Sequence, residues 1–362
     1  MIDCGFPVIR YERAHSPLQW GEQHGETYRD AVRQLAAIRR GLMFEKNPGL
    51  RDSIVSELAQ QQWRISAEYD AALTDELVGI SRGAGLPLED LVVLNNYTDF
   101  RDIQVPDQGC STVFVHRGTP LSGQTWDMHG SAKNFVCVID APAVEAEHRL
   151  RIFSVVGCVG MMGFHSAGRM VGVNNINTNG ARPGLMWPLL VRRMLQARTL
   201  PEMTEWLISA PVTSGHAYLL AGTDGASFWE VMPDLAERVD ALSAGQSGAI
   251  FHTNHCLGKQ AQRREVPLAR TSTTHIRYEL LKKKMETVNT LNDLYELLND
   301  HENYPQSICS NYQTNSQDPS ITCGGAVGEL TSGRLSFWRG DPLYDANFVR
   351  RDFPSVEAHV DD

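Results

Sequence analysis

The chain has 362 residues, of which 42% are hydrophobic and 21% charged, a composition typical of a soluble globular protein with a sizeable core. Its formal net charge of −10 argues against a general nucleic-acid binder, because such a protein needs a basic face. The longest apolar stretch, residues 153–164, is shorter than the about 20 residues that a membrane-spanning helix takes. No basic and then apolar leader is visible at the start, so we expect a cytoplasmic protein with no membrane partner.

The cysteines argue against both a disulfide framework and a cysteine-rich zinc site. Their number, seven, is odd, and no C-x-x-C pair occurs. They are Cys4, Cys110, Cys137, Cys158, Cys256, Cys309 and Cys323.

The part of the chain before residue 105 has helical patterns. Ala31, Leu35, Ile38 and Leu42 recur at helical spacing within a predicted helix over 19–44. Further helices are predicted over 54–63 and 71–82, and over 88–95 just after Pro87.

From Cys110 onward the pattern becomes that of short strands separated by turn residues. Strands are predicted over 111–116, 124–129, 134–140, 150–157, 169–175, 216–222, 226–232 and 248–254, with closing strands within 321–338. Helices are predicted over 187–209 and 272–299. Many strands with few, grouped helices indicate a layered α+β fold.

The Gly109–Cys110 pair stands at the start of the first of these strands and is the first candidate for chemistry. A free thiol has a pKa near 8.5 and needs a base, which the α-amino group of an N-terminal cysteine supplies. An internal cysteine becomes N-terminal only through cleavage of the peptide bond before it. Gly109 suits such a cleavage, because a residue without Cβ leaves its carbonyl open to the Cys110 sulfur. The alternative is that Cys110 is a buried small hydrophobic residue.

A hairpin between 111–116 and 124–129 predicts a carboxylate beside Cys110. If the turn is centred on Gly118 and Thr119, Asp127 lies opposite Cys110, although the register can slip by one or two residues. The alternative is that Asp127 is a strand-end residue that accepts hydrogen bonds from backbone amides.

Four stretches in this order resemble the isopenicillin N acyltransferase family, self-processing enzymes of the N-terminal-nucleophile hydrolase superfamily. They are a helical G-x-x-x-G (Gly21, Gly25) followed by GISRGAGLPLEDLVVLN, then DQGCSTVFV, GQTWDMH and GFHSAGRMVGVNN; HTNH at residues 252–255 is a further match. The resemblance implies an α+β fold with an αββα sandwich of two antiparallel sheets. It also implies a small chain, residues 1–109, and a large chain, residues 110–362, that remain associated after cleavage.

The resemblance further implies roles for matching residues. Cys110 is the implied nucleophile, Gly109 the residue before the cleaved bond, and Asn254 part of the oxyanion hole. Asp127 and Thr112 are implied to assist processing and orient the nucleophile. The implied substrate pocket is lined by Trp126, Asn174, Asn175, Asn177, His252 and His255.

Departures from the family pattern leave the substrate open. Members that act on penicillins have arginines after an S-I-C motif, whereas residues 307–320 contain none, and His165 replaces an asparagine. The expected partner is therefore a small acylated amine or an acyl donor such as acyl-CoA, with no cofactor.

Two other interpretations remain open at the level of sequence. An uncleaved thiol hydrolase would use His129, His252 or His255 as its base, and a non-catalytic relative would only bind a small molecule. The H-x-x-H-C motif at 252–256 offers zinc-ligand types, but neighbouring strand residues point to opposite faces, so no metal site is expected.

Overall fold

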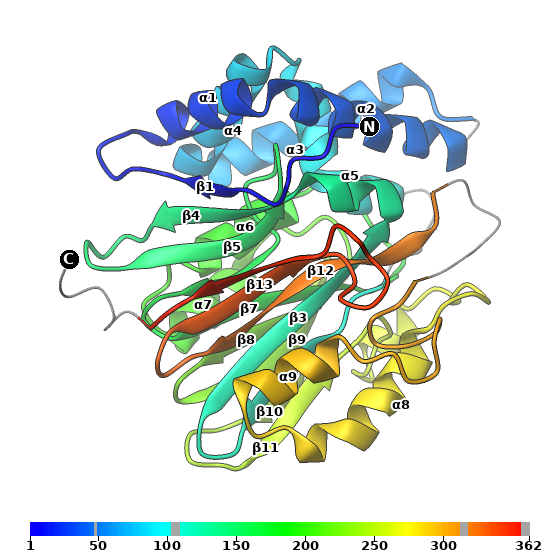
Figure 1. The fold of residues 1–362 in the computed structure, drawn as a ribbon. Coiled ribbons are helices and arrows are strands. Elements are labelled where there is room, and N and C mark those ends of the chain that lie inside the picture. Colours follow the sequence, from blue (N-terminus) through cyan, green and yellow to red (C-terminus); the bar gives the residue numbers. More distant parts are fainter. Residues whose placement is uncertain (47–48, 103–108, 312–317, 356–362) are drawn as a thin grey trace.

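The structure, a computed structural model, describes residues 1–46, 49–102, 109–311 and 318–355. Two β-sheets pack face to face, with helices on the outer sides (Figure 1). All neighbouring strands are antiparallel except β1 and β4, which pair in parallel. The αββα sandwich expected from the sequence is confirmed, with this one parallel pair as a correction.

The eight-stranded sheet contains, in spatial order, β1 (Val8–Arg10), β4 (Val136–Pro142), β5 (Arg149–Val155), β6 (Met162–His165), β7 (Arg169–Asn175), β8 (His216–Gly222), β9 (Gly225–Met232) and β10 (Leu235–Leu242). The six-stranded sheet contains β11 (Gly248–His252), β2 (Thr112–His116), β3 (Pro120–His129), β12 (Ser320–Glu329), β13 (Arg334–Arg339) and β14 (Val349–Phe353).

The N-terminal helices form a group of their own above the sheets in Figure 1. They are α1 (Pro17–Thr27), α2 (Arg29–Lys46), α3 (Asp52–Tyr69), α4 (Ala71–Ala84) and α5 (Leu88–Asp102). Helices α6 (Trp187–Met194) and α7 (Leu200–Ser209) contact β7, β8 and β9 of the eight-stranded sheet. Helices α8 (Thr274–Lys284) and α9 (Leu291–Leu298) cover the outer face of the six-stranded sheet with a separate apolar cluster.

Each of the three long predicted helices is divided in two. The helix predicted over 19–44 ends at the cap residue Tyr28, so that α1 packs on α4 while α2 packs on α5. The helix predicted over 187–209 is interrupted because Thr199 caps a new helix whose first turn contains a proline. In 272–299, Thr290 starts α9 with a capping box.

Two glycine pairs bring α1 and α4 into backbone contact. A Cβ on Gly21 would lie 2.0 Å from the Glu76 carbonyl oxygen, and a Cβ on Gly83 would lie 2.3 Å from the Glu22 carbonyl oxygen. No side chain fits at these distances, so the G-x-x-x-G spacing is explained by helix packing.

Buried polar contacts join the N-terminal segment to the sheets. The Glu76 carboxylate pairs with the Arg192 guanidinium at 3.1 Å, with both side chains almost completely buried. His24 Nε2 accepts a hydrogen bond from the Gly157 amide at 2.9 Å. No helix of the described residues is long and apolar enough to cross a membrane.

Candidate active site

Cys110 lies immediately before β2 and is buried among the side chains between the two sheets. Its backbone amide donates a hydrogen bond to Asn254 Oδ1 at 2.7 Å. Asn254 follows the end of β11, and β11 pairs with β2 so that His252 faces Thr112. The pairing of two strands far apart in sequence therefore brings Asn254 to Cys110.

The predicted hairpin register is wrong by one residue. Thr112 pairs with Gln124, and the Asp127 amide donates to the Gly109 carbonyl at 3.0 Å, so Asp127 faces Gly109 and Cys110 lies level with Trp126. The cause is the turn, in which three residues separate the strands and Gly118 adopts a positive φ of 93°. Asp127 nevertheless reaches the Gly109–Cys110 bond, because its own amide holds the Gly109 carbonyl.

The Asp127 carboxylate is buried beside Gly109. It accepts hydrogen bonds from the Thr322 hydroxyl at 2.8 Å and the Ser310 hydroxyl at 3.4 Å. A Cβ on Gly109 would lie 2.8 Å from Asp127 Oδ2, so any larger residue would have to displace the Asp127 carboxylate. Burial raises the pKa of Asp127 to about 6, against the opposing effect of the Arg277 charge.

Arg277 of α8 is a site residue that the sequence analysis missed. Its guanidinium is almost completely buried and donates to the Cys110 carbonyl at 2.6 Å and to Asn254 Oδ1 at 2.8 Å. It also bonds the Ser111 and Thr273 hydroxyls. The available signal was the helical spacing of Arg277 from Leu280 and Leu281. These three residues are buried on the same side of α8, which faces the sheet.

Asn254 is held in one amide orientation. Its Oδ1 accepts from two donors, the Cys110 amide and Arg277, and its Nδ2 donates to the Asn175 carbonyl at 2.8 Å. The backbone N–H of Asn254 donates to the Thr274 hydroxyl at 2.7 Å. Among the described residues, the Asn175 carbonyl is the one acceptor that Nδ2 contacts, although the group carries two donor hydrogens.

The Cys110 thiol is buried, which favours its protonated form. Burial and the Asp127 charge raise its pKa to about 12, while the Asp127 amide, Arg277 and Gln124 act in the opposite direction. A thiol in this state requires a base before it can act as a nucleophile.

The other predicted residues differ in their burial and hydrogen bonds. Thr112, Trp126 and Asn174 are buried, and neither the Thr112 hydroxyl nor the Asn174 amide group has a hydrogen-bond partner among the described residues. Asn175 joins the site through its carbonyl, and its side chain donates to Asn177 Oδ1 at 3.1 Å.

The two histidines of the H-x-x-H-C motif have protein partners. His252 Nε2 lies 2.8 Å from Glu230 Oε1, and its Nδ1 lies 2.8 Å from the Thr253 carbonyl. His255 contacts the Thr253 and Thr274 hydroxyls, and burial lowers the pKa of its imidazole to about 3. Among the described residues, these side chains form no convergent metal-ligand group with Cys256.

Comparisons with known proteins place the chain among acyl-transferring enzymes. Residues 115–342 match the family described as acyl-coenzyme A:6-aminopenicillanic acid acyl-transferase, and the chain belongs to this family. The match includes Asp127, Asn254 and Arg277, whereas Gly109 and Cys110 precede it. The 40 kDa form of the acyl-coenzyme A:6-aminopenicillanic-acid-acyltransferase of Emericella nidulans is 28% identical over 313 residues, which are 82% of this chain and 83% of that protein.

Solved structures show weaker similarity. A conjugated bile acid hydrolase from Clostridium perfringens aligns with a TM-score of 0.40 and 9% identity, covering 67% of this chain and 92% of its own. A penicillin V acylase from Agrobacterium tumefaciens aligns with a TM-score of 0.32 and 12% identity, covering 69% and 93%.

Proposed function

We propose that this chain is a self-processing cysteine amidohydrolase or acyltransferase in which Cys110 becomes the N-terminal nucleophile. The observation that carries the proposal is the network around one peptide bond. The Gly109 carbonyl is held by the Asp127 amide, and the Cys110 amide and carbonyl are held by Asn254 and Arg277. Asn254 and Arg277 reach this bond as side chains from distant segments, and the buried Asp127 carboxylate lies beside Gly109.

The proposed self-cleavage begins with attack of the Cys110 sulfur on the Gly109 carbonyl carbon. Asp127 accepts the thiol proton, and its amide donates to the carbonyl oxygen as negative charge develops there. Breakage of the C–N bond, with a proton delivered to the nitrogen, leaves a thioester and a free Cys110 amine. Water then hydrolyses the thioester to the Gly109 carboxylate and the Cys110 thiol.

The proposed cleavage supplies the base that the Cys110 thiol lacks before it. The Cys110 nitrogen, an amide donor in the uncut chain, becomes an amine that takes the thiol proton. The contact with Asn254 Oδ1 at 2.7 Å keeps this amine beside the sulfur. Asn254 Nδ2 is the proposed oxyanion donor, and Thr112 is proposed to orient the nucleophile.

In turnover, the acyl group of the substrate passes to Cys110 as a thioester and then to water or an amine. The E. nidulans relative is named for acyl-coenzyme A and 6-aminopenicillanic acid, and an acylated amine or acyl-CoA donor is therefore the proposed substrate class. Asn174 and Trp126 are proposed to line the pocket, because the Asn174 amide is buried without a hydrogen-bond partner among the described residues.

The geometry disfavours His252 as an alternative base. Both of its ring nitrogens already have protein partners, Glu230 and the Thr253 carbonyl, at 2.8 Å. The base that we propose after cleavage is the Cys110 amine.

Electrophile labelling tests the nucleophile directly. Treatment with a thiol-reactive acyl-amide analogue should modify Cys110 first among the seven cysteines, mapped by peptide mass spectrometry, and abolish hydrolysis of chromogenic acyl amides. Asp127→Asn protein, which is expected to stay uncut, is the matched control and should label slowly. Equal labelling of several cysteines, or labelled protein that keeps its activity, would refute the assignment.

A further inference from the structure

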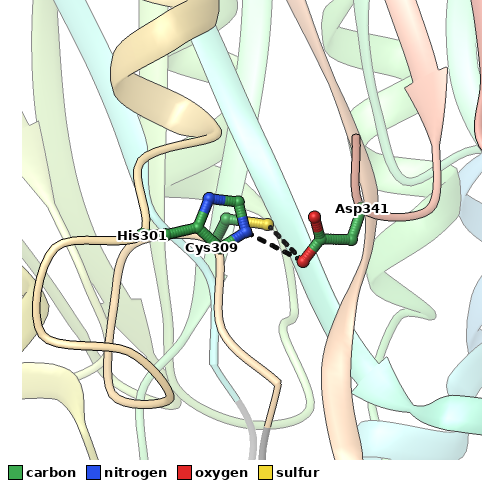
Figure 2. Close-up of side chains that lie close together, drawn as sticks. All are labelled: His301, Cys309 and Asp341. Atoms are coloured by element: carbon green, nitrogen blue, oxygen red, sulfur yellow. Dashed lines mark hydrogen bonds and ion pairs between the residues drawn. The ribbon is translucent and has the colours of Figure 1, made fainter. Parts of the chain in front are cut away.

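We infer that His301, Cys309 and Asp341 form a binding site for a single zinc ion, in which Cys309 directly precedes Ser310, a hydrogen-bond donor to Asp127. The three ligand atoms converge in Figure 2, and all lie within 4.8 Å of one another. The inference goes beyond the proposed acyl transfer and departs from the sequence expectation of no metal site.

The ligand types select the metal. Cys309 offers a sulfur, His301 an imidazole nitrogen and Asp341 a carboxylate oxygen, a mixed set that Zn²⁺ accepts and Mg²⁺ or Ca²⁺ does not favour. Metal–ligand bonds of about 2.0–2.3 Å require the ligand atoms to lie roughly 3.3–3.8 Å apart. Asp341 Oδ2 already lies 2.9 Å from His301 Nε2 and 3.7 Å from Cys309 Sγ. The His301 and Cys309 ligand atoms lie within 4.8 Å of each other, so small side-chain rotations would complete the set, with a water as the fourth ligand.

The backbone around the ligands is already fixed. Asp341 Oδ1 accepts from the Leu343 amide at 2.8 Å, which leaves Oδ2 facing the cluster. The Cys309 amide donates to the Asp300 carbonyl at 3.0 Å, and its neighbour Ser310 donates from its own amide to the Thr322 hydroxyl at 2.9 Å. Little conformational entropy is lost on binding, because the site is preorganised.

Charge balance favours a divalent cation. As metal ligands, the Cys309 thiolate and the Asp341 carboxylate would together carry two negative charges, which match the two positive charges of the ion. The Cys309 thiol would release its proton to solvent when the metal binds, as thiolate ligands do. The resulting complex of Zn²⁺ with one thiolate and one carboxylate is neutral, which lowers the cost of burial.

Tyrosine rings shield the proposed site. The Tyr344 ring lies 5.3 Å from the His301 ring, and the Tyr304 and Tyr344 rings lie 5.0 Å apart. Both tyrosines are partly exposed, so the metal has a short path from solvent. The side chains of His301 and Asp341 keep about a tenth of their surface exposed, whereas Cys309 is fully buried.

Cobalt titration tests the proposal, because thiolate-bound Co²⁺ has a charge-transfer absorption band. Chelator-treated wild type should bind one Co²⁺ with this band, and Zn²⁺ should displace it one for one. The Cys110→Ala protein should behave alike, which excludes the catalytic thiol. His301→Ala and Asp341→Asn should bind at least tenfold more weakly, and Cys309→Ser should lose the band while Cys137→Ser keeps it.

Three results would overturn the zinc site. They are the absence of saturable Co²⁺ or Zn²⁺ binding at micromolar concentrations, a band that persists in Cys309→Ser, and unchanged affinity in folded His301→Ala. The last variant keeps the test decisive if the buried Cys309→Ser fails to fold. Circular dichroism establishes which variants are folded.

Discussion

At the scale of single residues, the orientation of the Asn254 side chain decides what the site can do. Its oxygen faces the Cys110 amide and Arg277, both donors, so its nitrogen must face the Asn175 carbonyl. An aspartate of the same size would keep the accepting oxygen and lose the donor. Asn254→Asp therefore distinguishes the accepting oxygen of this side chain from its donating nitrogen.

We predict that Asn254→Ala lowers kcat by about 10²–10³, the usual cost of one oxyanion donor. Asn254→Asp should lose a similar factor in kcat, while it still holds the Cys110 amine through a carboxylate oxygen. Acyl-amide hydrolysis measures the effect, with the exposed Asn292→Ala on α9 as the control. An Asn254→Ala enzyme with wild-type kcat would remove Asn254 from the mechanism.

The buried Asp127 predicts a pH dependence of stability with a definite sign. The folded pKa of about 6 lies above the ordinary value of 3.8, so between pH 4 and 6 the folded chain retains a proton that the unfolded chain has released. The contribution of Asp127 to stability therefore falls as pH rises through this window, by about 3 kcal/mol in total.

Urea unfolding of Asp127→Asn and Asp127 proteins, both in the uncut Cys110→Ala background, measures this contribution. The stability of the asparagine variant relative to Asp127 should increase by up to about 3 kcal/mol from pH 4 to pH 7. A difference that stays constant with pH would show that the Asp127 pKa is not raised.

Sequence reasoning reached part of this site. Cys110 and Asp127 were found from their local context and Asn254 from the family resemblance, and the structure brings all three to the Gly109–Cys110 bond. Arg277 was missed because its role depends on the packing of α8 over the strand ends, 167 residues from Cys110. Local pattern contains no information on that contact.

At the scale of elements, the α1–α4 pair depends on glycines with no room for a methyl group. Gly83→Ala places a Cβ 2.3 Å from the Glu22 carbonyl oxygen and should lower the free energy of unfolding by about 1–3 kcal/mol or more. Gly41→Ala is the matched control, since Gly41 is an exposed α2 residue with no atom within 4 Å of a Cβ. It should raise stability by about 0.5–1 kcal/mol, because alanine favours helix.

Urea unfolding in the Cys110→Ala background compares the two variants. Equal effects of Gly83→Ala and Gly41→Ala would contradict the backbone contact between α1 and α4.

The elements themselves show where sequence patterns reach their limit. The periodicity gave the helical first third and the series of strands, and the two-layer sandwich is confirmed. The division of 19–44 at Tyr28 was missed because no glycine or proline stands at that residue. The parallel pairing of β1 with β4 joins Val8 to Val138, a contact set by tertiary packing and not by local propensity.

At the scale of the whole molecule, the proposed small and large chains share one folded unit. Strand β1 belongs to the eight-stranded sheet, and Glu76 pairs with Arg192 across the proposed division. Removal of one partner leaves the other charge buried, so Glu76→Ala should cost about 3–5 kcal/mol.

We predict that the cleaved wild-type protein elutes as a single peak in size-exclusion chromatography. A denaturing gel of this peak should show both fragments. Glu76→Ala should release the small fragment at lower urea concentration than wild type. Arg82→Ala, which removes a largely exposed ion pair with Glu22 inside the N-terminal segment, is the control. Fragments that separate without denaturant would contradict a shared core.

The intact mass of the purified protein tests the central claim, cleavage between Gly109 and Cys110, most directly. Wild type should give two masses, those of residues 1–109 and 110–362, and Cys110→Ala should give the single mass of the full chain. A wild-type chain that remains whole and yet hydrolyses acyl amides would contradict the account.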